Sequence, residues 1–371
     1  AKVEAALKEL DALFDRMTTE ADQADVPLQE GLYSGDAVNH LPAELANLEQ
    51  RRQKLQEICQ ALQAQDDARR KEGKNPEKNP AQMPKAAPDS KVMPNKEGGY
   101  AANYTPTVAV DVAGDFIVDC EVIADPNEHT QTLPVVDRTE ENFGEKPQAL
   151  LADKAHGVGE NLAGMALREV TFYTPMQTSQ PQEGNPAKRD DPTQPVPEFA
   201  WPQLPLNPQK RLDKSCFVYV ESSNSYYCPQ GRCLEHSEAY HATRNGKKVL
   251  VHIYRCKNCE HCPLSDVCRS PKARGGRQVE RDPYERLREE TAARMQTTEG
   301  RAIYARRMHG AETPFAYLKG VLGVRQFLLR GLENVRTEWR WACMAFNLQK
   351  LISKVAALRA KLSEAVTVAV V

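Results

Sequence analysis

Six of the ten cysteines fall between Cys228 and Cys268, and this cluster constrains the fold more than any other feature of the sequence. Cys256, Cys259, Cys262 and Cys268 have the spacing C-x2-C-x2-C-x5-C. Thiolates two residues apart on a tight turn can point at one centre, and Zn²⁺ takes four such ligands tetrahedrally. Metal binding supplies folding free energy that a small insertion cannot obtain from its own core. We therefore expect a structural zinc site at these four residues.

Two alternatives for the cysteines stay open. Three thiols at two-residue intervals also resemble an iron–sulfur pattern, although the usual ferredoxin run continues with a shorter interval and a Pro. The second alternative is that the thiols are buried in the core and bind no metal. His252 and His261 lie nearby in the sequence, and we expect them at the surface rather than among the ligands.

Composition excludes several classes of protein. The chain has 371 residues, which predicts two domains or one domain with large insertions, and 40% of them are hydrophobic, which excludes a disordered chain. It has no run of 18 apolar residues and no N-terminal basic region followed by an apolar stretch, so we expect a cytoplasmic protein without membrane segments. Ten cysteines without an export signal argue against a disulfide framework.

The formal charge of −2 hides an asymmetry. From Arg269 to Val371 there are 20 Lys and Arg against 10 Asp and Glu, so the C-terminal third is basic and the rest of the chain is acidic. A basic segment is the electrostatic footprint of a phosphate-binding face, although an ordinary solvated helix surface gives the same count.

Helical periodicity predicts an N-terminal hairpin of two helices. Apolar residues recur at helical spacing over 2–22 and again over 41–62, on either side of a polar break. The outer faces carry no recognisable chemistry, so we assign 1–65 as a structural or oligomerising helical arm. The next segment, 66–100, has few large apolar residues and is expected to be a flexible loop.

Strands alternate with helices over 101–173. The runs TPTVAVDVAG and DFIVDCEVIAD predict a β-hairpin. Helices are predicted for QTLPVVDRTEENF and ENLAGMAL, and short strands for QALLAD and EVTFYTP. This alternation predicts an α/β fold, with a mixed sheet covered by helices.

Composition divides the remaining chain into three segments. Nine prolines between residues 174 and 208 interrupt any regular element, so 174–210 is expected to be a Pro-rich linker. Residues 211–283 are rich in strands and cysteines and are assigned as a β insertion. Residues 284–371 are helical, and we assign them to the C-terminal part of the core.

One helical segment places a carboxylate among cations. On a continuous helix Arg301, Glu312 and Lys319 project within about 20° of one another. Gly310 and Pro314 predict a kink between them. An ordinary salt-bridged helix face is the alternative.

A second candidate carboxylate, taken together with Glu312, indicates a chemical function for this helix. Asp153 ends the predicted buried strand QALLAD. A carboxylate at a strand end, together with Glu312 on a later helix, is the arrangement that holds two Mg²⁺ ions for in-line attack on a phosphodiester.

On these residues the chain resembles the DDE transposases of bacterial insertion sequences, whose catalytic core is an RNase H-like fold carrying Asp, Asp and Glu. The stretch LLADKAHGVGENL is similar to the family motif Asp-x-Gly-Tyr-x-x-x-Glu-Asn through Asp153, Glu160 and Asn161. Ala155 and His156 stand where Gly and Tyr are usual.

The family's third acid lies in a helix with a Tyr-Arg-Glu-Lys signature, and Tyr304, Arg307, Glu312 and Lys319 correspond to it. The interval between Arg307 and Glu312 is one residue longer than in the commonest form. The segments RQFLLRGLENVRTEW and AFNLQKL are similar to the family's C-terminal end, and the cysteine-rich stretch is similar to that of one branch.

The resemblance implies an RNase H-like α/β core and Mg²⁺-dependent cleavage and transfer of DNA strands by a homodimer at insertion-sequence ends. It implies that Asp153 and Glu312 are catalytic metal ligands. It also implies contacts to DNA phosphates or the strand end for four residues of the helix: Arg301, Tyr304, Arg307 and Lys319.

The resemblance leaves the first catalytic Asp unassigned. In the family this Asp lies in an Asp-Gly-Thr-like motif ahead of the helical hairpin, and this sequence has no such motif there. Asp111 and Asp89 are not at the position where the family has its first Asp. We expect an upstream piece with this Asp and a DNA-binding domain, which makes the 371-residue chain catalytically incomplete. A transposase-derived DNA-binding protein without activity and a metal-stabilised scaffold protein are the alternatives.

Overall fold

The structure is a computed structural model. It describes residues 2–25, 43–71, 73, 75–78, 81, 83–84, 88–94, 98–176, 184–244, 247–270 and 275–367. The chain forms two compact units. The first contains Ala1–Thr105, Val122–Pro126 and Phe327–Glu338, and the second contains Pro106–Glu121, Asn127–Gln326 and Trp339–Val371.

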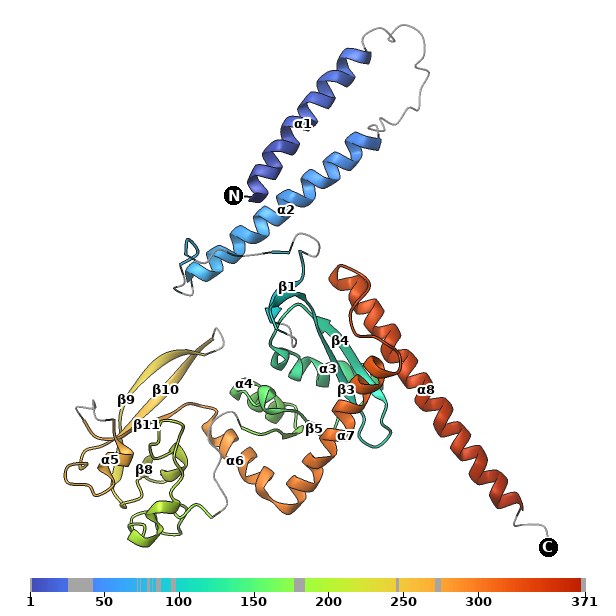
Figure 1. Cartoon of the computed structure of the whole chain (residues 1–371). Coiled ribbons are helices and arrows are strands. Elements are labelled where there is room, and N and C mark those ends of the chain that lie inside the picture. Colours follow the sequence, from blue (N-terminus) through green and yellow to red (C-terminus); the bar gives the residue numbers. More distant parts are fainter. Residues whose placement is uncertain are drawn as a thin grey trace. The chain divides into compact units, whose positions relative to one another are not determined.

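The first unit begins with two long helices, α1 (Lys2–Asp25) and α2 (Ala43–Lys71), which lie side by side in Figure 1. Leu10 of α1 is buried, and Arg52 Nε of α2 lies 2.7 Å from Asp11 Oδ1. Helices thus form over both segments with helical periodicity. The second continues to Lys71, beyond the boundary that we expected at residue 65.

Part of the expected loop over 66–100 is ordered, so that prediction is wrong there. Strand β1 (Lys91–Pro94) pairs antiparallel with β2 (Tyr100–Asn103). Met93 is buried in this pair, and Lys91 Nζ lies 3.0 Å from Asp125 Oδ2. A four-residue strand with one buried apolar residue has no periodicity to detect, because its stability comes from pairing with another segment.

The α/β part of the chain, most of which belongs to the second unit, has the predicted order of elements. They are β3 (Thr105–Val110), β4 (Ile117–Ile123), the 3₁₀ turn η1 (Glu128–Gln131), α3 (Thr132–Phe143), β5 (Ala149–Leu151), the 3₁₀ turn η2 (Lys154–His156), α4 (Gly159–Leu167) and β6 (Thr171–Tyr173). β3 and β4 form a hairpin, while β5 and β6 are parallel. Within the described residues these are two separate pairs rather than the single mixed sheet that we expected.

The core of this part lies where three helices pack on β5 and β6. Its buried side chains include Val136 of α3, Met165 of α4 and Phe172 of β6. Gly164 allows α3 and α4 to approach closely, since a Cβ at this position would lie 2.4 Å from Leu133 Cδ1. The α/β class is therefore observed, and an RNase H-like arrangement stays a prediction.

The cysteine-rich segment forms a five-stranded antiparallel sheet in the order β11-β10-β9-β8-β7. Its strands are β7 (Val218–Val220), β8 (Ser225–Tyr227), β9 (Cys233–Arg244), β10 (Lys247–Cys256) and β11 (Gln278–Arg281). Tyr226 and Tyr254 pack edge to face with ring centroids 5.1 Å apart.

The Pro-rich segment is not a linker where it is described. It contains the 3₁₀ helix η3 (Glu198–Gln203), and Ala187 and Leu204 are buried in the core of the cysteine-rich sheet. The Arg189 guanidinium donates to the carbonyls of four residues, Ala187, Pro192, Gln194 and Cys228. Prolines prevent a regular ladder here, so one side chain satisfies the backbone carbonyls instead. Residues 177–183 of the expected linker lie outside the described residues.

The chain then becomes helical, as predicted. After the 3₁₀ turn η4 (Lys214–Cys216) and the short α5 (Ser265–Cys268) come α6 (Glu285–Gln296), α7 (Thr298–Gly320) and α8 (Leu332–Thr367). α7 runs through Gly310 and Pro314 as one helix. No helix among the described residues has the length and apolarity that crossing a membrane requires.

Candidate functional site

Asp153 lies two residues after the end of β5, where its carboxylate caps η2. Its Oδ1 accepts the Ala155 N–H at 2.9 Å, and its side chain is half exposed. Thr174 fixes the backbone at this point, because its hydroxyl donates to the Asp153 carbonyl at 2.7 Å. One oxygen of the Asp153 carboxylate therefore accepts a hydrogen bond within the turn, while the side chain stays accessible to solvent.

His156, which stands where the family motif has Tyr, is half-buried beside this carboxylate. Its Nδ1 lies 2.8 Å from Thr132 Oγ1, and its Nε2 lies 3.8 Å from Asp153 Oδ1. The buried Asn161 amide nitrogen contacts the His156 carbonyl at 3.0 Å and Thr132 Oγ1 at 2.8 Å. Burial lowers the pKa of His156 despite the opposing effect of Asp153. This shift favours the uncharged imidazole, which serves as a hydrogen-bonding group.

Helix α7 exposes the face that carries the predicted residues. The Thr297 hydroxyl caps its start by accepting the Gly300 N–H at 2.9 Å, and Leu318 is buried on its inner side. Glu312, Arg301 and Lys319 are all exposed. Arg301 and Lys319 are 18 residues apart and so lie about 27 Å from each other along the helix axis. These two residues therefore lie on the same face of α7 but at different positions along it.

Two cations of α7 rest on aromatic rings. The Arg307 guanidinium lies 5.7 Å from the centroid of the Tyr304 ring, and its Nε is buried without a hydrogen-bond partner among the described residues. Lys319 Nζ lies 5.6 Å from the centroid of Phe315, which stacks on Trp339 of α8.

The middle of α7 approaches two turns of the same unit, the turn at Asp153 and the β3–β4 turn. The charge of Arg307 contributes to the lowered pKa of His156, which places it near the Asp153 turn. A Cβ at Gly310 would lie 3.9 Å from Val112 Cγ2, next to Asp111 in the β3–β4 turn. The Asp111 carboxylate caps that turn by accepting the N–H groups of two residues, Ala113 at 3.1 Å and Gly114 at 2.6 Å.

These contacts do not assemble a metal centre. Among the residues that the structure describes, no three His, Cys, Asp or Glu side chains form a group that could hold a metal ion. This applies to Asp153 and Glu312 as well as to the cysteines.

The cysteines nevertheless gather in one place. Cys228, Cys256, Cys259 and Cys268 are buried in the core of the cysteine-rich sheet, and Cys262 packs against them; none forms a disulfide. The Arg277 N–H donates to Cys259 Sγ at 3.4 Å. Gly276 is required beside it, because a Cβ there would lie 1.7 Å from the Cys256 carbonyl oxygen.

Cys228 is the member that the spacing argument omitted. It begins the turn between β8 and β9, in which Gly231 has a φ of +69°. The Cys268 thiol interacts electrostatically with those of Cys228, Cys259 and Cys262, and burial raises the pKa of Cys268 to about 12. The Cys-Pro pair at 228–229 repeats the Cys-Pro pair at 262–263, and this repetition was the available sequence signal.

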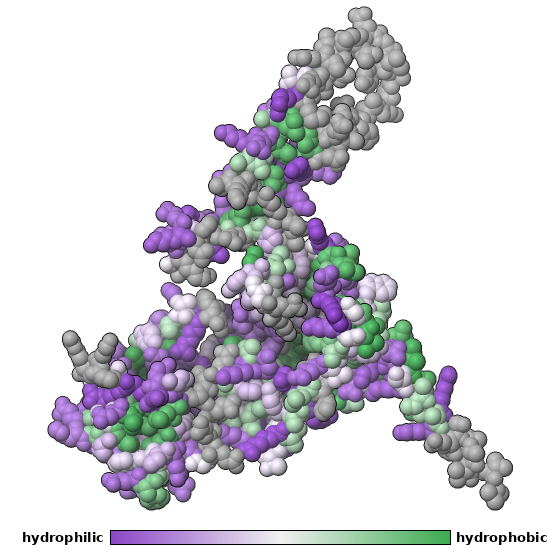
Figure 2. Space-filling view, viewed as in Figure 1, coloured by the Kyte–Doolittle hydropathy of each residue, from purple (hydrophilic) through white to green (hydrophobic). Residues whose placement is uncertain are grey.

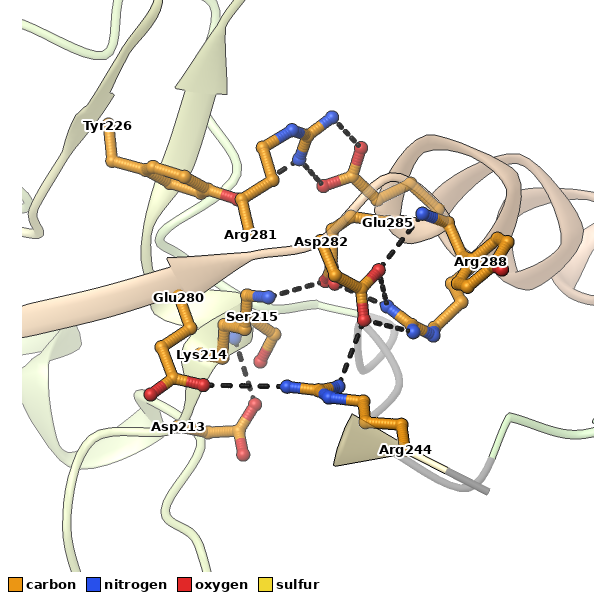
Figure 3. A network of polar contacts seen from close by, with 12 residues as sticks. Asp213, Lys214, Ser215, Tyr226, Arg244, Glu280, Arg281, Asp282, Glu285 and Arg288 are labelled. Atoms are coloured by element: carbon orange, nitrogen blue, oxygen red, sulfur yellow. Dashed lines mark hydrogen bonds and ion pairs between the residues drawn. The ribbon is translucent and has the colours of Figure 1, made fainter. Parts of the chain in front are cut away.

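Sequence reasoning also missed a buried carboxylate between two arginines (Figure 3). Asp282 follows β11, and its side chain is only 1% exposed. Its oxygens lie 2.6 Å from Arg288 of α6 and 2.9 Å from Arg244 of β9. Oδ1 also accepts the Tyr284 N–H at 2.9 Å, next to the start of α6. Burial opposes ionisation, but the Arg288 hydrogen bonds prevail and hold the pKa of Asp282 below its ordinary value.

Comparison with known proteins adds one finding. Residues 227–352 match the family model of a transposase DDE domain. This DDE domain match includes the turn at Cys228, the other clustered cysteines, Asp282 and all of α7 with Glu312, whereas Asp153 lies outside it. It supports a relation to the DDE transposases. No curated protein and no solved structure matches the chain.

Proposed function

We propose that this protein is a DDE transposase that cleaves and joins DNA strands at insertion-sequence ends. The observation that carries the proposal is the DDE domain match over α7, the helix that bears Glu312. In the same unit, α7 approaches the Asp153 turn through Arg307. DNA is therefore the proposed partner, and a homodimer is the proposed active form.

Asp153 and Glu312 are the proposed ligands of catalytic Mg²⁺, since both carboxylates are accessible and Mg²⁺ prefers oxygen ligands. Two such ions, when bound, supply activation of the attacking hydroxyl and stabilisation of the leaving oxygen. His156 holds the Asp153 turn through Thr132. Asp111 is the third carboxylate to test, because its turn lies against α7.

The exposed face of α7 is the proposed track for the DNA backbone. Arg301 and Lys319 would neutralise phosphates at its two ends, with Arg307 between them. Tyr304, under the Arg307 guanidinium, would contact the strand end.

A structural zinc ion in the cysteine-rich sheet is the second part of the proposal. The spacing favours Cys256, Cys259, Cys262 and Cys268 as ligands. The electrostatic contacts add Cys228 as a candidate ligand, because the Cys268 thiol interacts with those of Cys228, Cys259 and Cys262. The thiols would bind the ion as thiolates, and the Arg277 N–H would stabilise Cys259 in that form.

The proposed activity is tested with the protein encoded by the whole gene, incubated with Mg²⁺ and DNA that carries the ends of its element. Asp153→Asn and Glu312→Gln should each lower the cleavage rate by orders of magnitude while DNA binding persists, since neither removes a cation. Glu299→Gln, an exposed acid in the first turn of the same helix, is the matched control and should cleave normally. Cleavage that survives Glu312→Gln would refute the site.

A non-catalytic DNA-binding derivative is the second candidate. Three features favour it: His156 occupies the usual Tyr position, Asp111 is engaged in its own turn, and no three acidic side chains gather among the described residues. Sequence-tolerant DNA binding by the whole protein, without Mg²⁺-dependent cleavage, would identify it.

A further inference from the structure

Two cysteines outside the cysteine-rich sheet lie side by side, one on β4 and the other on α8. Cys120 of β4 is partly buried, Cys343 of α8 is only 2% exposed, and both are free thiols. The Cys343 thiol is hydrogen-bonded to the Cys120 sulfur. The two residues are far apart in the sequence, so only the fold brings their sulfur atoms together.

Contacts between α8 and the β3–β4 hairpin fix the position of Cys343. Trp339 Nε1 donates to the Thr107 carbonyl of β3 at 3.1 Å. Asn347 accepts the Ile117 N–H of β4 at 2.9 Å and donates to the Ile117 carbonyl at 2.8 Å. Cys343 stands four residues after Trp339 and four before Asn347, so the three side chains share the helix face that packs on the hairpin.

Alternation along β4 directs Cys120 towards the same interface. The preceding residue, Asp119, is buried, and its carboxylate lies 2.7 Å from the guanidinium of Arg138 on α3. Successive side chains of a strand point to opposite faces, so Cys120 points away from α3. The hydrogen bond with Cys343 agrees with this direction. Regular secondary structure thus holds both thiols in place.

The two thiols differ in reactivity. The hydrogen bond from Cys343 lowers the pKa of Cys120, although burial opposes this effect. The positive charge of Arg340 acts in the same direction, and the negative charges of Asp119 and Glu121 oppose it. The same hydrogen bond and burial raise the pKa of Cys343. Because the thiolate is the nucleophilic form of cysteine, Cys120 is the thiol that reacts first, and Cys343 is placed to react second.

The surroundings of the pair favour a small uncharged oxidant. Trp341 and Met344, close to Cys343 in the sequence, are 65% and 51% exposed. Figure 2 shows hydrophobic residues gathered along α8. A charged oxidant such as glutathione disulfide loses hydration at an apolar surface, whereas hydrogen peroxide carries no charge. Hydrogen peroxide is therefore the oxidant that suits this site.

We propose that Cys120 and Cys343 form a peroxide-sensitive dithiol whose oxidation links α8 covalently to β4. The Cys120 thiolate attacks one oxygen of hydrogen peroxide, the O–O bond breaks, and the other oxygen leaves as hydroxide, which takes up a proton to form water. Cys120 is then a sulfenic acid. The Cys343 sulfur attacks the Cys120 sulfur, the S–S bond forms and the S–O bond breaks, and the hydroxide leaves with the Cys343 proton as water.

The two thiols together lose two electrons and two protons, and hydrogen peroxide is reduced to two water molecules. This inference goes beyond the proposed function, because it requires neither DNA nor Mg²⁺.

The test treats the reduced, full 371-residue chain with a small excess of hydrogen peroxide, alkylates the remaining thiols and digests the protein without reductant. Trypsin places the two cysteines on separate peptides, 97–138 and 341–350, each with one cysteine. Mass spectrometry should show these peptides joined, with a mass two hydrogens below their sum, and dithiothreitol should separate them. Cys59→Ser, at a partly buried cysteine of α2, is the control and should retain the link.

Single variants separate the roles of the two thiols. In Cys343→Ser the reaction should stop at the Cys120 sulfenic acid, which dimedone labels. In Cys120→Ser both the link and the labelling of Cys343 should be absent. Far-UV circular dichroism checks the fold of each variant, and Cys343→Ala provides a second variant at the buried position.

Three results would overturn the proposal. The first is absence of the joined peptides after oxidation of the folded wild type. The second is an equal yield of the link in protein unfolded by urea, because the fold would then not be what places the thiols together. The third is dimedone labelling of Cys59 that equals or exceeds that of Cys120 in Cys343→Ser.

Discussion

At the scale of single residues, Asp282 is the clearest case of a role that only the folded chain reveals. It has no local pattern beyond the Asp-Pro pair at 282–283. In the structure it joins three elements, since Arg244 comes from β9, Arg288 from α6 and Asp282 itself follows β11. A buried charge is stable only when it is paired and hydrogen-bonded, and this one is.

Asp282→Asn should lower the free energy of unfolding by about 3 kcal/mol, because it leaves two arginines without their shared carboxylate. Glu280→Gln is the matched control. Glu280 lies 3.5 Å from the same Arg244 but is half exposed, so its loss should cost less than about 1 kcal/mol. Urea unfolding measures both values. Equal effects of the two substitutions would contradict the role of burial.

The pH dependence of stability follows from the lowered pKa of Asp282. A carboxyl group whose pKa is lower in the folded state stabilises the fold above its unfolded pKa of about 3.9, and this contribution is lost as the pH falls through the folded pKa. The unfolding midpoint of Asp282→Asn should therefore depend less on pH below about 4 than that of the wild type. Urea titrations between pH 7 and pH 3 provide the comparison, and identical profiles would rule out the linkage.

At the scale of elements, the turn between β8 and β9 shows how neighbours in space differ from neighbours in sequence. Cys228 and Cys233 flank this short turn, yet Cys228 is buried in the cysteine core while Cys233 begins β9 outside it. The spacing of the later cysteines cannot reveal this, because β9 and β10 separate them from Cys228 along the chain.

Cys228→Ser should abolish zinc binding if Cys228 is a ligand, and Cys233→Ser should retain about one zinc ion per chain. Elemental analysis of protein purified under reducing conditions measures the metal. Chelation should unfold the cysteine-rich sheet and spare the α/β part. Iron with visible absorption would indicate a cluster instead, and zinc retained by Cys228→Ser but lost in Cys256→Ser would restore the ligand set predicted from spacing.

At the scale of the whole molecule, the distribution of charge gives a prediction for the proposed DNA binding. The basic C-terminal third contains α7 with its exposed cations. Phosphate neutralisation releases counterions, so binding to duplex DNA should weaken steeply and with little sequence preference as salt rises.

Lys319→Ala should lower both the affinity for duplex DNA and the slope of log K against log salt, the latter by about one phosphate contact. Lys146→Ala, which removes the same charge from an exposed site outside α7, where Lys146 Nζ donates to the Arg168 carbonyl, should leave the slope unchanged. Salt titrations by fluorescence anisotropy supply both quantities. An unchanged slope for Lys319→Ala would show that this residue does not face phosphate.

The sequence by itself determined the features that depend on local spacing. Periodicity was sufficient for the order of helices and strands over 101–173 and for the helices after residue 284, because side chains repeat at 3.6 or 2 residues within one element. The motifs around Asp153 and Glu312 together indicated the DDE relation that the domain match supports.

Only the tertiary structure decided which distant residues meet. It buried Ala187 and Leu204 of the Pro-rich segment in a core, placed Cys228 beside the four regularly spaced cysteines and enclosed Asp282 between two arginines. Each of these outcomes depends on contacts between elements far apart in the chain. Such contacts leave no period in the sequence, since their free energy comes from burial and pairing that exist only after folding.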